Sequence, residues 1–149
     1  MSLQQDIMTA MKTAMKAKDQ TALAALRAVK SELLLAQTET GSKEEISEEH
    51  EIKILSKLVK QRKDSATIFT EQNRLDLAEP ELAQAEVISQ FLPEQLSEDA
   101  IEKVVVETIA KVGAEGMKDM GKVMGIVNQQ LAGKADGKTI STLVKKNLV

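Results

Sequence analysis

The stretch FLPEQLSED, residues 91–99, divides the chain into two parts. Pro93 disfavours a helical conformation at the residue before it, so a helix that reaches this stretch is expected to end there. Ser97 is followed by two acidic residues, which is the pattern of an N-terminal helix cap with negative charge in the first turn. The stretch therefore predicts a domain boundary, with one domain over residues 1–92 and a smaller one over residues 93–149.

Ahead of this boundary, apolar residues recur at intervals of three and four, the spacing of a helix that packs one face against a core. We expect a first helix over about residues 2–18 and a second that starts at an Asp19 cap. A polar connection over residues 38–46 leads to a third helix, the longest, which starts at a Ser47 cap. Arg62 is the odd, charged member of its apolar stripe.

The fourth helix is expected to carry Pro80 in its first turn, where the missing amide hydrogen costs nothing. Alternatively, this helix begins near Asn73 and kinks at the proline. After the boundary, the pattern predicts three short helices, over about residues 98–112, 118–132 and 136–147. The fold class is therefore all-α, with an N-terminal helical domain followed by a small C-terminal three-helix domain.

The composition is typical of a folded globular protein without disulfides. Hydrophobic residues make up 42% and charged residues 29% of the 149 residues, which supports a core and argues against disorder. The absence of cysteine excludes thiolate metal ligands and fits a reducing compartment. No segment approaches the roughly 18 apolar residues that a membrane span needs. We therefore expect a cytoplasmic protein without a membrane partner.

Positive charge and glycine are both concentrated at the C-terminal end. The whole chain has a net charge of −3, whereas residues 116–149 hold six lysines and two aspartates, which gives +4. Residues 121–141 contain four of the seven glycines. A basic end on an acidic body suits directed contact with an anion better than non-specific coating of nucleic acid.

Two glycines in this region are four residues apart, at Gly121 and Gly125, so they share a helix face and leave its backbone open to close approach. The approaching group is either a neighbouring helix or a ligand. Gly133 is expected to end this helix in a left-handed conformation, and Asp136 is expected to cap the next. Helix packing does not explain the nearby lysines, and free amides at the start of the last helix attract anions. The sequence therefore predicts a nucleic-acid contact formed by Lys118, Gly121, Lys122, Gly125, Lys134 and Lys138.

No catalytic or cofactor-binding motif is recognisable in the sequence. His50 is the single histidine, lacks the partners of a catalytic triad, and is interpreted as a surface side chain. The acidic stretch KEEISEEHE, residues 43–51, could supply metal ligands, but carboxylates at a helix start are explained more simply by the helix dipole. No nucleotide-binding glycine motif occurs. We therefore expect no catalytic residue, metal or cofactor.

A second group of cations lies on the predicted third helix. Lys53, Lys57 and Lys60 share one face there and could meet phosphates. We interpret this face as solvated, because glutamates surround it and no aromatic residue is interleaved for base stacking.

Five segments, in this order and spacing, resemble the GatB/YqeY-like family and specifically its small stand-alone YqeY type. They are RKDSATIF (62–69), NRLDLAEPE (73–81), FLPEQLS (91–97), DMGKVMG (119–125) and GKADGKTIS (133–141). The resemblance covers nearly the whole chain. Asn73 departs from the glycine expected in the family and Phe91 from the expected tyrosine, so the family's turn geometry and one hydroxyl contact are not carried over to this chain.

The resemblance implies a C-terminal domain similar to the tail of the B subunit of glutamine-dependent tRNA amidotransferase. In that enzyme the tail engages tRNA, while amide transfer and phosphorylation occur in domains that are absent here. Our first hypothesis is a tRNA-associated accessory module without autonomous catalysis. The alternatives are a component of a carbon–nitrogen ligase with glutamine as amido-N-donor, which implies amidotransferase subunits as partners, and a helical protein-interaction module that binds another protein.

Overall fold

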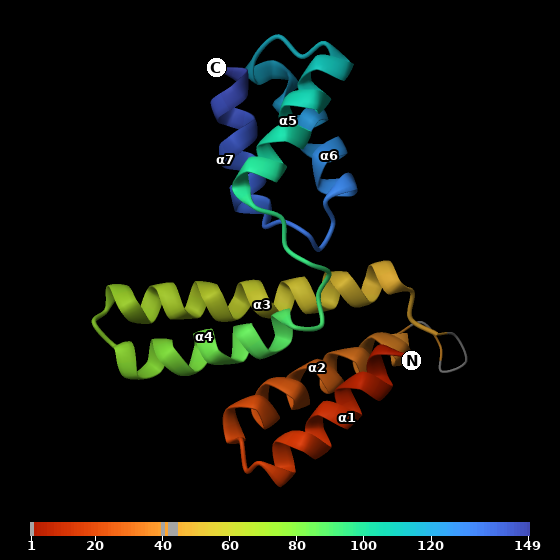
Figure 1. The fold of residues 1–149 in the computed structure, drawn as a ribbon, viewed down its shortest axis with the longest axis vertical. Coiled ribbons are helices and arrows are strands. Elements are labelled where there is room, and N and C mark those ends of the chain that lie inside the picture. The colour runs from red at the N-terminus through yellow and green to blue at the C-terminus, as the bar shows by residue number, and fades with distance from the viewer. Residues whose placement is uncertain (1, 40, 42–44) are drawn as a thin grey trace. The chain divides into compact units, whose positions relative to one another are not determined.

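The computed structural model describes residues 2–39, 41 and 45–149, and these residues form helices without a β-strand (Figure 1). The all-α fold class predicted from the sequence is confirmed. The α-helices of the described ranges are α1 (Leu3–Lys16), α2 (Gln20–Glu39), α3 (Glu48–Glu71), α4 (Leu75–Ser89), α5 (Glu98–Val112), α6 (Met120–Gln130) and α7 (Gly137–Leu148). A short 3-10 turn, Met117–Asp119, precedes α6.

The chain divides into two compact units, residues 1–92 and residues 93–149. Each unit has a separate cluster of buried apolar side chains. A unit with its own core meets the basic requirement for folding alone. The second unit is short, and a domain of that length has only marginal stability. Independent folding of the two units stays a prediction.

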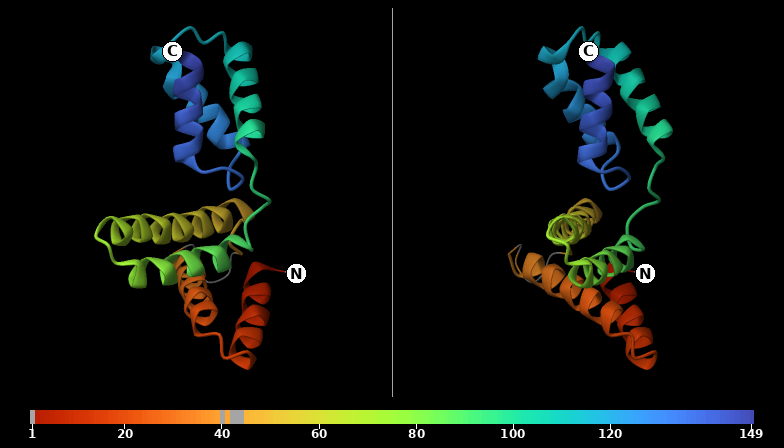
Figure 2. Two further views of the ribbon diagram at one scale, coloured as in Figure 1. Left: turned by 60° about the vertical axis from the view of Figure 1, so that its left-hand side comes forward. Right: turned by 90° about the vertical axis from the view of Figure 1, so that its left-hand side faces the viewer.

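Two helical hairpins form the first unit. Helix α1 packs against α2, α3 packs against α4, and α4 also packs against α2 (Figures 1 and 2). The apolar stripes predicted from the sequence meet in one core. Its fully buried members include Ile7, Leu26, Val29, Leu33, Leu55 and Ile88.

Side-chain caps fix where the helices of this unit begin. The Asp19 carboxylate accepts a hydrogen bond of 3.0 Å from the backbone N–H of Ala22. The Ser47 hydroxyl accepts one of 3.2 Å from the backbone N–H of His50. Both caps satisfy amides that have no partner within the helix, so both cap predictions are confirmed. Residues 40 and 42–44 of the predicted connection lie outside the described residues.

The turn between α3 and α4 is closed by a left-handed residue, Asn73, with a φ of 60°. The N–H of Arg74 donates to the carbonyl of Phe69 at 2.7 Å, and the N–H of Asn73 donates to that of Thr70 at 3.0 Å. This pair of bonds is a Schellman motif, which satisfies the last carbonyls of α3. The Arg74 guanidinium then bonds both carboxylate oxygens of Asp76 in the first turn of α4.

Pro80 lies inside α4, not in its first turn as predicted. The helix begins at Leu75, so the proline occupies the second turn, and the carbonyl of Asp76 loses the amide that would have bonded to it. The helix starts early because the Schellman turn ends α3 and leads directly into it. The alternative with a start near Asn73 is closer to the observed helix.

Arg62 is accommodated on the apolar face of α3 by hydrogen bonds. Its Nε donates to Oε1 of Gln84 on α4 at 3.1 Å, and its Nη1 donates to the carbonyl of Leu58 at 3.2 Å. The side chain is half-buried, so its aliphatic part packs while its polar end is satisfied.

Helices α5, α6 and α7 pack pairwise and form the second unit. The completely buried members of its core are Val105, Val123, Val127 and Val144. The Ser97 hydroxyl accepts the N–H of Ala100 at 3.2 Å and caps α5, as predicted. The predicted ranges of α5 and α7 agree with the structure to within one residue.

Helix α6 is shorter than the predicted 118–132. The residues before Met120 form the 3-10 turn, and the helix ends at Gln130. Gly133 has a φ of 75°, so the predicted left-handed glycine is confirmed, although it lies in the turn beyond the helix end. The N–H of Lys134 donates to the carbonyl of Leu131 and closes this turn at 2.9 Å.

Candidate nucleic-acid interface

Helix α6 presents to solvent a face with little side-chain bulk. Val123 and Val127 are completely buried on the other side, which fixes the rotation of the helix about its axis. The solvent side carries residues at intervals of three and four, the period of one helix face. We call it the α6 face, and its exposed residues are Gly121, Lys122, Gly125, Asn128 and Gln129, to which we add Lys118 of the preceding 3-10 turn.

The two glycines of the α6 face do not make room for another part of the chain. A methyl group added to either Gly121 or Gly125 would have no heavy atom within 4 Å beyond the helix's own backbone. Neither residue has a positive φ, so the backbone does not require glycine either. Glycine inside a helix costs about 1 kcal/mol relative to alanine. Packing within the described chain therefore does not account for this pair.

The predicted lysines fall into two groups, and all four are exposed. Lys118 lies in the 3-10 turn just before α6, and Lys122 is the third residue of α6. Lys134 lies in the turn after α6, where its carbonyl accepts the N–H of Leu96 at 2.9 Å, and Lys138 is the second residue of α7. Lys122 precedes the end of α6 by about 12 Å at 1.5 Å per residue, so it does not lie at this turn.

Two aspartates accompany these lysines, and both are engaged by backbone amides. The Asp119 carboxylate accepts the N–H of Glu115 at 3.1 Å. The Asp136 carboxylate accepts the N–H of Lys138 at 3.2 Å, which confirms the predicted cap of α7. This cap also places a negative charge at the start of α7, where free amides were expected to attract an anion. The α6 face is therefore the better candidate for an anion contact.

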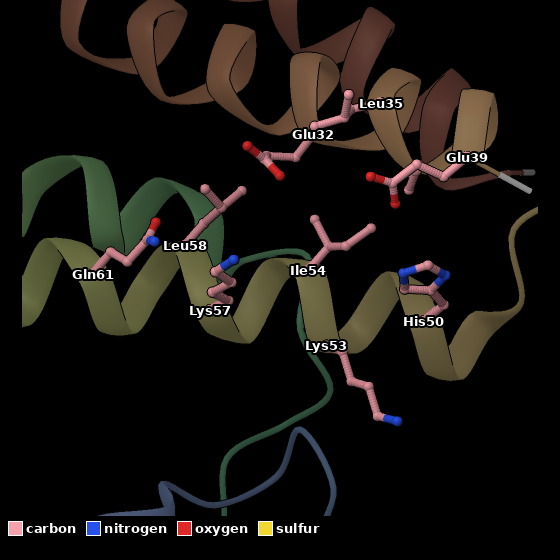
Figure 3. A pocket seen from close by; sticks show the side chains of 10 residues that line it. Glu32, Leu35, Glu39, His50, Lys53, Ile54, Lys57, Leu58 and Gln61 are labelled. Carbon is pink, nitrogen blue, oxygen red and sulfur yellow. The ribbon is translucent and has the colours of Figure 1, made fainter.

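The predicted cations of α3 are all exposed, and they differ in their surroundings. Nζ of Lys53 lies 3.4 Å from the Glu49 carboxylate, and Lys60 is exposed. Lys57 lines a groove between α2 and α3 together with His50 (Figure 3). His50 is half-buried there, so its interpretation as a plain surface residue is only partly right.

The acidic residues at the start of α3 occupy its first turn, as the dipole argument predicts. Burial raises the pKa of the Glu51 carboxyl, and the nearby charges of Glu48 and Glu45 raise it further. Residues 43 and 44 of the acidic stretch lie outside the described part. Within the described part, no three acidic or histidine side chains gather in a way that could hold a metal ion.

A family model described as Yqey-like protein matches residues 4–148, nearly the whole chain. The chain belongs to the YqeY-like family. Its relatives include the E subunit of the glutamyl-tRNA(Gln) amidotransferase of Thermococcus sibiricus, which is 34% identical over 111 residues. That match covers 74% of this chain and 17% of the relative. The corresponding protein of Thermococcus gammatolerans is 38% identical over 73 residues, which cover 46% of this chain and 12% of the relative.

Another relative of this YqeY-like chain is of similar size. Altered inheritance of mitochondria protein 41 of Clavispora lusitaniae is 30% identical over 126 residues, which cover 82% of this chain and 72% of the relative. The name of that relative places it in mitochondria. None of the helices described here is long and apolar enough to cross a membrane. The cytoplasmic location expected from the composition stays a prediction.

The two departures from the YqeY-like pattern fit their surroundings. Asn73 adopts the left-handed conformation that favours glycine, and asparagine tolerates this conformation better than other residues with a side chain. Phe91 packs partly buried against the core of the first unit, where its ring needs no hydroxyl partner. Both residues therefore keep the local backbone and packing of this chain intact.

Proposed function

We infer that this YqeY-like protein is a tRNA-associated accessory module whose α6 face contacts the phosphate backbone. The observation that carries the proposal is the pair of exposed glycines, Gly121 and Gly125, with open space above them and two lysines beside them. A face without side-chain bulk lets a polyanion approach closely. Ammonium groups and side-chain amides on the same face then donate to phosphate oxygens.

The charge distribution supports a contact of moderate strength. Lys118 and Lys122 can neutralise two phosphates, and Lys134 and Lys138 can reach two more if the RNA extends past the end of α6. Four such contacts give a slope of about −2.8 to −3.6 in log affinity against log salt concentration. Contacts of this kind position a nucleic acid without reading its sequence.

The relatives favour tRNA over other polyanions. Several are named as subunits of glutamyl-tRNA(Gln) amidotransferase, and the chain spans only 12 to 17% of the length of the Thermococcus proteins. A shared segment of this size is consistent with a module that acts beside larger enzymes. We place the bond-forming chemistry in other proteins, because the α6 face offers donors to an anion and no nucleophile or general base.

A tRNA titration of the full chain at several salt concentrations tests the contact. Changing both Lys118 and Lys122 to Gln is expected to make the salt slope shallower by about 1.4 to 1.8. The matched control changes Lys103 and Lys145 to Gln, two exposed lysines outside the α6 face that carry the same total charge. Equal effects of the two double variants, or no binding at low salt, would refute the contact.

A role as a component of a carbon–nitrogen ligase is the second candidate, supported by the names of the amidotransferase relatives. It predicts that the chain stimulates glutamine-dependent amidation of mischarged tRNA when an amidase subunit and ATP are supplied. If the chain stimulates amidation by contacting tRNA, the double variant of Lys118 and Lys122 is expected to give no stimulation. Unchanged amidation with and without the chain would contradict this role.

A further inference from the structure

A groove of about 340 Å³ lies between α2 and α3 in the first unit (Figure 3). The α2 wall uses residues 32, 35, 36 and 39, and the α3 wall uses residues at the same three- and four-residue spacing from 50 to 61. Each wall is thus one continuous helix stripe. The α3 stripe extends about 16 Å at 1.5 Å per residue, which is three helical turns. This elongated shape matches a helix better than a compact small molecule.

The floor of the groove is apolar and only partly covered. Leu58 and Ala36 are buried at its base, Ile54 is half-buried, and Leu35 remains 55% exposed. When a partner covers an apolar side chain, the complex is stabilised by about 25 cal/mol per Å² of apolar surface removed from water. The floor therefore supplies the attraction, and Leu35 on the α2 wall adds uncovered apolar surface.

Charges of opposite sign rim the two sides. Glu32 and Glu39 stand on the α2 wall, two turns or about 10.5 Å apart along the axis. Within the described part of the chain, neither carboxylate forms an ion pair. Lys57 points into the groove from α3, whereas Lys53 points away from it, consistent with its pairing to Glu49 (Figure 3).

We propose that this groove docks an amphipathic helix of a partner protein, with two basic residues seven positions apart facing Glu32 and Glu39. Apolar residues at the intervening positions cover Leu35, and an acidic residue on the other edge meets Lys57. This is the helix-in-groove mode of recognition, with rim charges that select the orientation of the incoming helix. The site is separate from the α6 face and does not depend on RNA binding.

The test uses a fluorescent synthetic peptide of about 18 residues, long enough to form an isolated helix when rich in alanine. It carries leucines along one face and two arginines seven positions apart, and a second peptide carries glutamates at those two positions. Anisotropy with the full chain is expected to show about tenfold tighter binding of the arginine peptide. Changing both Glu32 and Glu39 to Arg is expected to reverse this preference.

Two adjacent leucines supply a matched pair of controls. Leu35→Glu is expected to abolish binding of the arginine peptide, and Leu34→Glu is expected to leave it unchanged, because Leu34 is similarly exposed but lines the α1 side of α2. Circular dichroism of both variants checks that they are folded. The proposal fails if neither peptide binds, if both bind equally, or if the two leucine variants behave alike. Self-association of the chain that Leu35→Glu abolishes would mean that the groove binds a second copy of this chain. That result would also overturn the proposal.

Discussion

Replacing Gly125 by alanine is expected to stabilise the second unit. Gly125 is an interior residue of α6, so alanine gains about 1 kcal/mol of helix propensity there. The added methyl group meets no heavy atom within 4 Å beyond the helix backbone, so no steric cost opposes this gain. Gly121 is the second residue of α6, and the same change there is expected to stabilise less because a helix end is already frayed.

The assay is native-state hydrogen exchange in the full chain, followed at the buried amide of Val127, which reports on the second unit. For a unit of this size, about 1 kcal/mol also corresponds to a rise of about 4 to 8 °C in the midpoint of thermal unfolding.

Gly113 provides a control with the opposite sign. Its φ of 66° is left-handed, so Gly113→Ala is expected to destabilise the same unit by about 1 kcal/mol. Destabilisation of the unit by Gly125→Ala would contradict this expectation, because it would mean that packing or backbone conformation requires glycine at this position. A gain in stability would show that folding of the second unit does not require glycine at this position.

Three further predictions concern stability. Arg62→Ala is expected to lower the free energy of unfolding in urea by about 1 to 3 kcal/mol, because it leaves the Gln84 acceptor unpaired, and a loss no larger than that of an exposed lysine on α3 would contradict this. Residues 93–149 expressed alone are expected to unfold cooperatively, and a fragment without a thermal transition would count against an independent domain. A hydrogen bond from Asn147, together with the ammonium of Lys146, lowers the pKa of Glu102. The stabilisation from this carboxylate is therefore present above its ordinary pKa and is lost as pH falls through the lowered value, and Asn147→Ala is expected to raise that pKa in an NMR titration, whereas an unchanged pKa would contradict the assignment.

Local signals made much of the fold predictable. Asp19, Ser47, Ser97 and Asp136 cap helices where the sequence predicts, because a capping side chain bonds an amide only two or three residues away. Pro80 was misplaced because its tolerance inside α4 depends on where the previous helix ends. That end is set by the left-handed Asn73, and a single asparagine is a weaker turn signal than glycine.

The candidate site was only partly predictable. Helical spacing places Gly121 and Gly125 on one face, but it does not say whether that face is covered. Exposure depends on how α6 rotates against the other two helices, and this is a long-range property. The groove beside Leu35 was missed for the same reason: it requires two helices to diverge, and neither helix encodes that divergence in its own period.

The most direct measurement of the central claim is an NMR titration of the isotope-labelled full chain with unmodified tRNA at low salt. The α6 face is expected to respond first, with shifts or broadening at the amides of Gly121, Lys122 and Gly125, and these changes are expected to vanish as salt is raised. Perturbations confined to residues 1–92, or none at any tRNA concentration, would contradict a role of this face in RNA contact.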